Sequence, residues 1–275
     1  MSLREIKHNL SCVFCALLVL FVFLNPVSAQ QRPLVTEDPR LISSGSMVVE
    51  TGISYLDRVR FPVSGLGGNE FELLNSGFHF GLGDRAEFQV TGVFQNVLLV
   101  HENGSGRRSD WGDFALSTKM RLAEEGKFRP IVSFRPTVVL PNSNNEKGIG
   151  TNTTKVFGTL LFGKSAGRAF VFANAGLGIL DDPVHAAAQQ DVFTYGMAVM
   201  LPLGRSTRLV YEWNGLQNPR DRPGLGAENR RQMRLGAQLV LGGLRWDMAG
   251  VAGLTRLDPR AGVVLGVTKE FRLWK

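Results

Sequence analysis

The chain has 275 residues, 44% of them hydrophobic, and a formal net charge of +7. Its basic residues are spread singly along many segments, which argues against a nucleic-acid partner because such proteins gather them into a patch. The only two cysteines, Cys12 and Cys15, lie near the N-terminus, so we expect no disulfide and no thiolate metal site in the rest of the chain.

Residues 1–29 have the pattern of a cleaved signal peptide. Arg4 and Lys7 precede a short apolar run at 13–24, and Val27-Ser28-Ala29 fits the small-residue cleavage site. A retained membrane anchor is the alternative, but the run is short of the roughly 20 residues that span a bilayer as a helix. We therefore expect export of the chain, with the mature protein starting near Gln30.

Residues 30–46 lack any alternation of polar and apolar side chains and contain Pro33 and Pro39. We interpret them as an N-terminal segment that leads into the main domain. It is either periplasmic or tucked into the mouth of a barrel. Residues 47–275 form that domain.

The stretch Phe78–Phe94 shows how this domain is built. It predicts two strands joined by a tight turn at Gly81–Arg85, and after the turn Phe88 and Val90 lie on one face while Glu87 lies on the other. The same alternation recurs to the C-terminus. It predicts twelve strands, to within about two, at 47–56, 70–82, 85–97, 111–122, 128–140, 153–163, 168–180, 191–201, 207–214, 231–241, 244–254 and 261–274.

The connections between these strands alternate in length. Short ones are expected at 81–85, 123–127, 163–167, 202–207 and 242–243, and long polar ones at 57–69, 98–110, 141–152, 181–190, 215–230 and 255–260. Outer-membrane barrels have short periplasmic turns and long external loops. No second apolar run is long enough for a spanning helix, so we expect an all-β, antiparallel up-and-down barrel in the bacterial outer membrane. Its expected partners are outer-membrane lipid, lipopolysaccharide and the barrel-assembly machinery.

Polar side chains on the inward strand faces are the candidate functional residues. Lys or Arg facing lipid at mid-membrane costs about 2–4 kcal/mol, so such groups must line water or pair with each other. Both signs of charge occur, and we expect some pairing. The candidates for a lumen lining and substrate path are Glu87, Gln89, Asp113, Lys119, Arg121, Arg135, Glu212, Arg234, Gln238, Arg245 and Asp247.

Several short motifs resemble one family of outer-membrane proteins, which is grouped with the phenol meta-cleavage (MetA) degradation pathway. They are Arg32-Pro-Leu-Val-Thr-Glu-Asp-Pro39, Glu50-Thr-Gly52, Gly81-Leu-Gly83-Asp84-Arg85, Gly112-Asp113 with Lys119, and Leu140-Pro141 with Gly148–Gly150. The resemblance covers most of the mature chain and implies a transporter-like barrel for small or hydrophobic molecules. The chain departs from the usual aromatic ending of such barrels in one respect, because Lys275 follows Trp274 at the C-terminus.

A passive channel or uptake porter for small molecules, hydrophobic and aromatic ones included, is the function that these features favour. The alternatives are a structural or surface-interaction barrel with a closed lumen, and a hydrolase with its site at the rim. His79, His101 and His185 are widely separated and lack ligand spacing, so we expect neither a metal site nor an enzyme, and no cofactor is implied.

Overall fold

The computed structural model describes residues 32–185 and 188–274. The predicted signal peptide lies outside these residues and stays a prediction. No helix in the described part of the chain is both long and apolar enough to cross a membrane.

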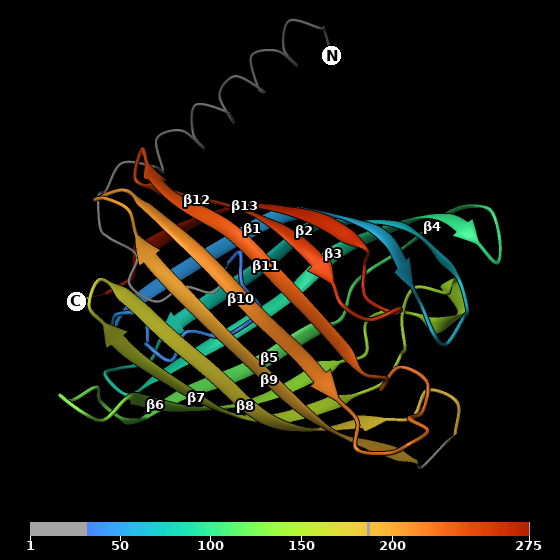
Figure 1. The fold of residues 1–275 in the computed structure, drawn as a ribbon, viewed down its shortest axis with the longest axis horizontal. Coiled ribbons are helices and arrows are strands. Elements are labelled where there is room, and N and C mark those ends of the chain that lie inside the picture. The colour runs from blue at the N-terminus through green and yellow to red at the C-terminus, as the bar shows by residue number, and fades with distance from the viewer. Residues whose placement is uncertain (1–31, 186–187, 275) are drawn as a thin grey trace, which may run out of the picture.

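Thirteen strands form one antiparallel sheet within the described residues (Figure 1). The first strand pairs with the last, from Ser46 opposite Arg272 to Asp57 opposite Ala261, so the sheet closes into a barrel of twelve strands to which β4 is an extension. Closure leaves no unpaired edge, as a sheet in a membrane requires. The strands are β1 (Ser46–Arg60), β2 (Gly67–Gly81), β3 (Ala86–Glu102), β4 (Gly106–Asp110), β5 (Phe114–Ala123), β6 (Ile131–Leu140), β7 (Lys155–Ala166), β8 (Ala169–Asp181), β9 (Gln189–Pro202), β10 (Thr207–Gln217), β11 (Arg230–Leu241), β12 (Leu244–Gly253) and β13 (Ala261–Arg272).

The predicted all-β, up-and-down barrel is confirmed, but one predicted loop is wrong. The stretch 98–110 is not a long loop: β3 runs on to Glu102 and pairs with β4, which leaves only 103–105 between them. Leu98 and Val100 are buried against Ile149 of the connection 141–154. Their inward packing extends the strand where the sequence turns polar.

The sorting of connections by length is also less strict than predicted. The turn between β5 and β6 spans 124–130 and is as long as the connection 254–260 at the opposite end. The tightest turn is Gly242-Gly243, where φ is 63° and 71°. Two positive φ angles are what a two-residue hairpin requires and what glycine supplies.

The outer wall is apolar along the predicted strand faces. Leu235 and Met248 are 65% and 60% exposed, whereas Gln238 and Asp247 on the same two strands are 2% and 4% exposed. This alternation is typical of a barrel with lipid outside and polar groups inside. Tyr55, Trp213 and Trp246 are also exposed on the outside, as expected for aromatic residues at the membrane boundary.

Candidate functional site

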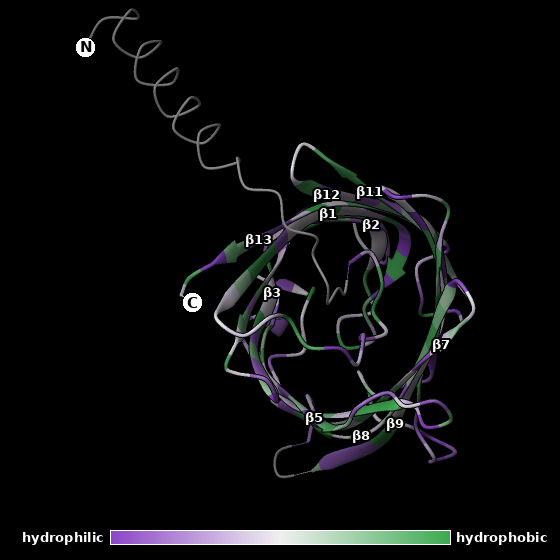
Figure 2. Ribbon diagram, turned by 90° about the vertical axis from the view of Figure 1, so that its left-hand side faces the viewer, coloured by the Kyte–Doolittle hydropathy of each residue, from purple (hydrophilic) through white to green (hydrophobic). Residues whose placement is uncertain are grey.

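The lumen is occupied by residues 32–45, which we call the inner segment. Thr36, Glu37 and Asp38 are 1%, 2% and 0% exposed, so these polar residues lie deep inside the ring of strands and not at its mouth. A view along the barrel shows chain inside the ring (Figure 2). The segment lacks strand alternation because it runs across the lumen instead of along the wall.

Glu37 is the central anchor of this segment. Its carboxylate lies 2.8 Å from Lys119 Nζ on β5 and 2.6 Å from Arg135 Nη1 on β6, and it accepts a hydrogen bond from Gln89. Lys119 also pairs with Glu87 at 3.0 Å. Two carboxylates and two cations therefore balance, as a buried charge cluster must if it is not to cost several kcal/mol.

Burial raises the pKa of Glu37, but the Lys119 and Arg135 cations outweigh this effect and bring it below its ordinary value of 4.5. The carboxylate is therefore ionised at neutral pH. Its ion pairs hold the middle of the inner segment to the wall.

A second carboxylate, Glu212 on β10, binds the backbone of the segment. It accepts hydrogen bonds from the N–H groups of Val35 and Thr36 at 2.7–3.0 Å. Arg234 on β11 lies beside it and donates to the carbonyl of Pro33 at 2.9 Å. The wall thus satisfies backbone groups that no regular secondary structure could pair here.

Arg32 fixes the start of the described chain. It donates to the carbonyls of Asn75 and Leu265 at 3.1 Å, and its Nε lies 3.6 Å from Asp247. A side-chain Cβ at Gly52 or Gly266 would clash with the guanidinium. These strand glycines therefore leave the room in which Arg32 lies.

Eight of the eleven candidates predicted from sequence contact the inner segment. They are Glu87, Gln89, Lys119, Arg135, Glu212, Arg234, Gln238 and Asp247. Their inward direction follows from strand phase, but their partners are on the segment. Whether they also form a substrate path stays a proposal.

The other three candidates have partners in the wall or in connections. Asp113 accepts from the Ser143 backbone at 3.0 Å and pairs with Lys155 at 3.1 Å. Arg121 bonds the Asp84 carbonyl and lies 3.3 Å from Glu124, so it belongs to the turns. Arg245 pairs with Glu50 at 3.0 Å.

An apolar cluster closes the part of the lumen nearest the short turns. Leu34 of the segment packs with Phe172, Val210 and other buried side chains that point inward from four strands. The strands 168–180 and 191–201 are apolar in both phases for this reason. Their inner face meets the segment, and their outer face meets lipid.

Three cavities occupy the other part of the lumen. Cavities of about 470 and 360 Å³ share Val35, Gln232 and Arg234 as lining residues, so both reach the inner segment. A third, of about 270 Å³, lies under the long connections and shares Asp113 with one of them and Arg230 with the other. The three cavities are therefore neighbours in the space between the long connections and the segment.

Sequence reasoning missed Arg32, Glu37 and Arg230 as functional residues. The first two belong to a stretch without periodicity, and Arg230 was assigned to a loop although it begins β11. The sequence did offer one signal for a segment inside the lumen. Many charged residues are predicted on the inward strand faces, and several glycines face inward as well.

Metal chemistry has no candidate in the described ranges, where no group of three or more His, Cys, Asp or Glu side chains could hold an ion. His79 is buried, with its ring nitrogens 3.9 Å from Glu50 and Glu87. It therefore belongs to the charge cluster around Lys119.

No family model and no curated protein matches the chain. Among solved structures, an outer-membrane channel from Pseudomonas putida F1 is 15% identical with a TM-score of 0.63, and the match covers 85% of this chain and 98% of that one. The chain is a β-barrel of the bacterial outer membrane.

Two other barrels match more weakly. The NanC porin is 8% identical with a TM-score of 0.48, covering 81% of this chain and 97% of that one. The β domain of the Bordetella autotransporter BrkA is 8% identical with a TM-score of 0.49, covering 82% and 99%. At such identities the comparisons show the fold, and the function must be argued from the lumen.

Proposed function

We propose that this outer-membrane barrel is a passive channel for small molecules and that the inner segment forms its constriction. The observation that carries the proposal is the set of neighbouring cavities between the long connections and the segment. These cavities are bordered by arginine and other polar side chains, which suits the passage of small molecules.

The contacts of the segment suit a constriction that moves. Apart from the apolar packing of Leu34, many of them are discrete hydrogen bonds and ion pairs, such as Glu37 with Arg135 and Glu212 with the Thr36 N–H, and none of the described strands forms a ladder with the segment. Discrete polar contacts can be exchanged for water one at a time. Displacement of the segment then opens the lumen while the sheet stays closed.

A structural barrel with a closed lumen is the second candidate. It is favoured by the apolar cluster around Leu34, which gives a polar molecule nothing to bind.

The resemblance to the meta-cleavage family bears on the cargo of the proposed channel. Small aromatic or hydrophobic molecules are proposed on that resemblance alone.

A reversible lock tests the role of the segment. A Cβ at Gly196 would lie 3.2 Å from Thr36 Cβ, close to the 3.5–4.5 Å that a disulfide spans. The double variant Thr36→Cys, Gly196→Cys adds the only cysteines of the mature chain, and its current is measured in planar bilayers before and after reduction.

We expect the wild type to conduct, the oxidised variant to be silent and the reduced variant to recover. The two single-cysteine variants control for the substitutions themselves. If the folded wild type does not conduct, the channel proposal is wrong and the closed structural barrel is supported. Equal conductance of the oxidised and reduced forms would keep the channel but show that the segment does not move.

A further inference from the structure

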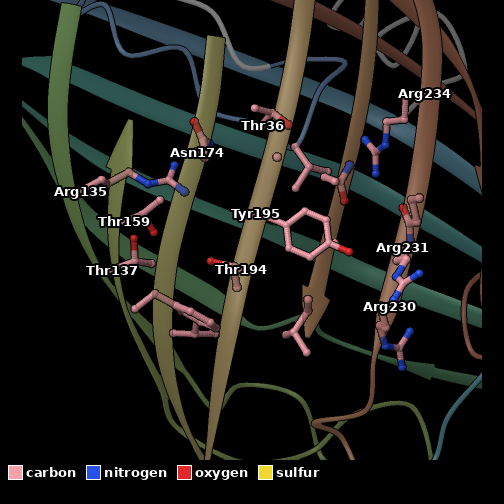
Figure 3. Close-up of a pocket in the computed structure, with 18 residues that line it drawn as sticks. Thr36, Arg135, Thr137, Thr159, Asn174, Thr194, Tyr195, Arg230, Arg231 and Arg234 are labelled. Carbon is pink, nitrogen blue, oxygen red and sulfur yellow. The ribbon is translucent and has the colours of Figure 1, made fainter. Parts of the chain in front are cut away.

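The largest of the three lumenal cavities, of about 470 Å³, has one basic region (Figure 3). Arg135 lies on one side of it, and Arg230, Arg231 and Arg234 lie on β11 on the other side. Thr36 of the inner segment also borders it. No Asp or Glu is among the described residues that line this cavity.

The positive charge here exceeds the negative charge by two, because four arginines line the cavity and only two of them pair with carboxylates. Of the other two, Arg231 is the more exposed and donates to Gln217. Arg135 is balanced by Glu37 and Arg234 by Glu212, at 2.6 and 3.4 Å. Arg230 donates to the Leu257 carbonyl, and among the described residues no carboxylate lies within 4.0 Å of it. It interacts with Glu70 at longer range.

Several donors around this cavity have an N–H group to spare. In the described part of the chain, Arg135 Nε and Asn214 Nδ2 are buried without a hydrogen-bond partner, as is the hydroxyl of Thr36. Arg234 Nε makes no hydrogen bond either, although it lies 3.4 Å from Glu212. All four residues line the same cavity. Buried polar atoms usually have a partner, so their convergence on one cavity suits an acceptor that binds there.

The rest of the lining is apolar. Phe157 and Leu216 point inward and pack against the buried cluster of Leu180, Val192 and Ala227. Tyr195 also borders the cavity, but its ring packs on Trp213 at 5.1 Å among the outward side chains. The apolar surface inside therefore comes from Phe157 and Leu216.

We infer that this cavity binds a small organic monoanion, a carboxylate carried on an apolar body. The carboxylate accepts from the spare N–H groups near Arg135, Arg234 and Asn214, with Arg230 supplying the charge that balances it. The body lies on Phe157 and Leu216. A cavity of 470 Å³ is within the 300–1,000 Å³ usual for small ligands.

This inference rests on the proposed channel only for its biological meaning, because binding can be measured without transport. Isothermal titration calorimetry on the full-length, detergent-solubilised barrel compares three probes: cyclohexanecarboxylate, its neutral isostere cyclohexanecarboxamide, and acetate. We expect the first to bind at least about tenfold more tightly than either of the others, because each lacks the charge or the body.

Variants assign the binding to this cavity. Arg230→Gln should weaken cyclohexanecarboxylate about tenfold. The control is Arg222→Gln, which removes the same charge at an exposed position of the connection 218–229 that lines none of the three cavities, and it should leave the affinity unchanged. Phe157→Ala should reduce the preference over acetate while acetate binding is kept.

Equal affinity for the acid and the amide, or an equal loss in both arginine variants, would overturn the site. Tight binding of inorganic phosphate in place of the carboxylate would overturn the ligand class. Binding without conductance would support the binding site and contradict the proposed channel. Conductance without binding would support the channel and contradict the binding site.

Discussion

Glu37 and Arg135 form an ion pair of 2.6 Å although they are 98 positions apart and only Arg135 belongs to the barrel wall. The same carboxylate binds Lys119 at 2.8 Å. A single side chain of the inner segment thus joins two neighbouring strands, and its charge state controls how firmly the segment is held.

Glu37→Gln should release the segment. Removing one partner of a buried ion pair costs about 3–5 kcal/mol, because the remaining charge is left without compensation. In planar bilayers we expect the variant to open more often than wild type. Glu124→Gln is the control, since Glu124 is exposed in the turn after β5. Equal opening of Glu37→Gln and wild type would show that the pair does not hold the segment.

Acid should act in the same direction as this substitution. The pKa of Glu37, which lies outside the membrane-spanning strands, is lowered from 4.5, so its stabilising effect is present above pH 4.5 and is lost as the pH falls through the lowered value. We expect wild-type conductance to rise below pH 4.5 and the Glu37→Gln response to be flatter. Glu87 and His79 also titrate in this cluster, so an unchanged response in Glu37→Gln would assign the effect to them.

Ion preference should depend on Arg230, which lines a lumenal cavity and has no carboxylate within 4.0 Å among the described residues. Rings of charge set ion selectivity in pores, so Arg230→Gln should move the reversal potential under a salt gradient towards cation preference. Arg121→Gln should change it less, because Arg121 lies among the turns beside Glu124. A larger effect of Arg121→Gln would place the selective region at the turns.

The orientation predicted from connection length can be tested with single cysteines. Ser105→Cys lies at the exposed tip of the β3–β4 hairpin and Arg222→Cys at an exposed position of the long connection 218–229, and Lys127→Cys and Arg205→Cys lie at exposed positions of the turns at the opposite end. An impermeant thiol reagent on intact cells should label the first pair only. The reversed labelling pattern would show that the barrel has the opposite orientation in the membrane.

The outer face predicts a sharp difference between two substitutions on β11. Leu235→Arg puts a charge into lipid at a cost of about 2–4 kcal/mol, which should block heat-modifiable gel migration of the folded barrel. Gln232→Arg, three residues earlier, faces the cavities and should assemble. Equal damage from both would refute the strand phases.

The barrel wall could be predicted from sequence because its signal is local. Leu235 and Gln238 differ in exposure as their strand phases require, and pairing registers follow once the strands are antiparallel. The loop predicted at 98–110 failed because Leu98 and Val100 are held in a strand by Ile149, a contact across the fold.

The site could be predicted only in part. Gln89 and Gln238 read as water-lining positions, yet they donate to Glu37 and to the Arg32 carbonyl. Nothing in the sequence places Glu37 beside Lys119, because a segment without secondary structure has no period. Its position depends on contacts that span up to 233 residues, from Arg32 to Leu265.

The bond from Arg32 to Leu265 also has a consequence for the order of assembly. The first described residue finds its acceptor on the last strand, so the segment is fully anchored only after β13 has paired with β1. Contacts of such long separation form late in folding. We therefore expect the newly closed barrel to pass through a hollow state, in which dye leaks from vesicles until the segment is seated and the leak seals.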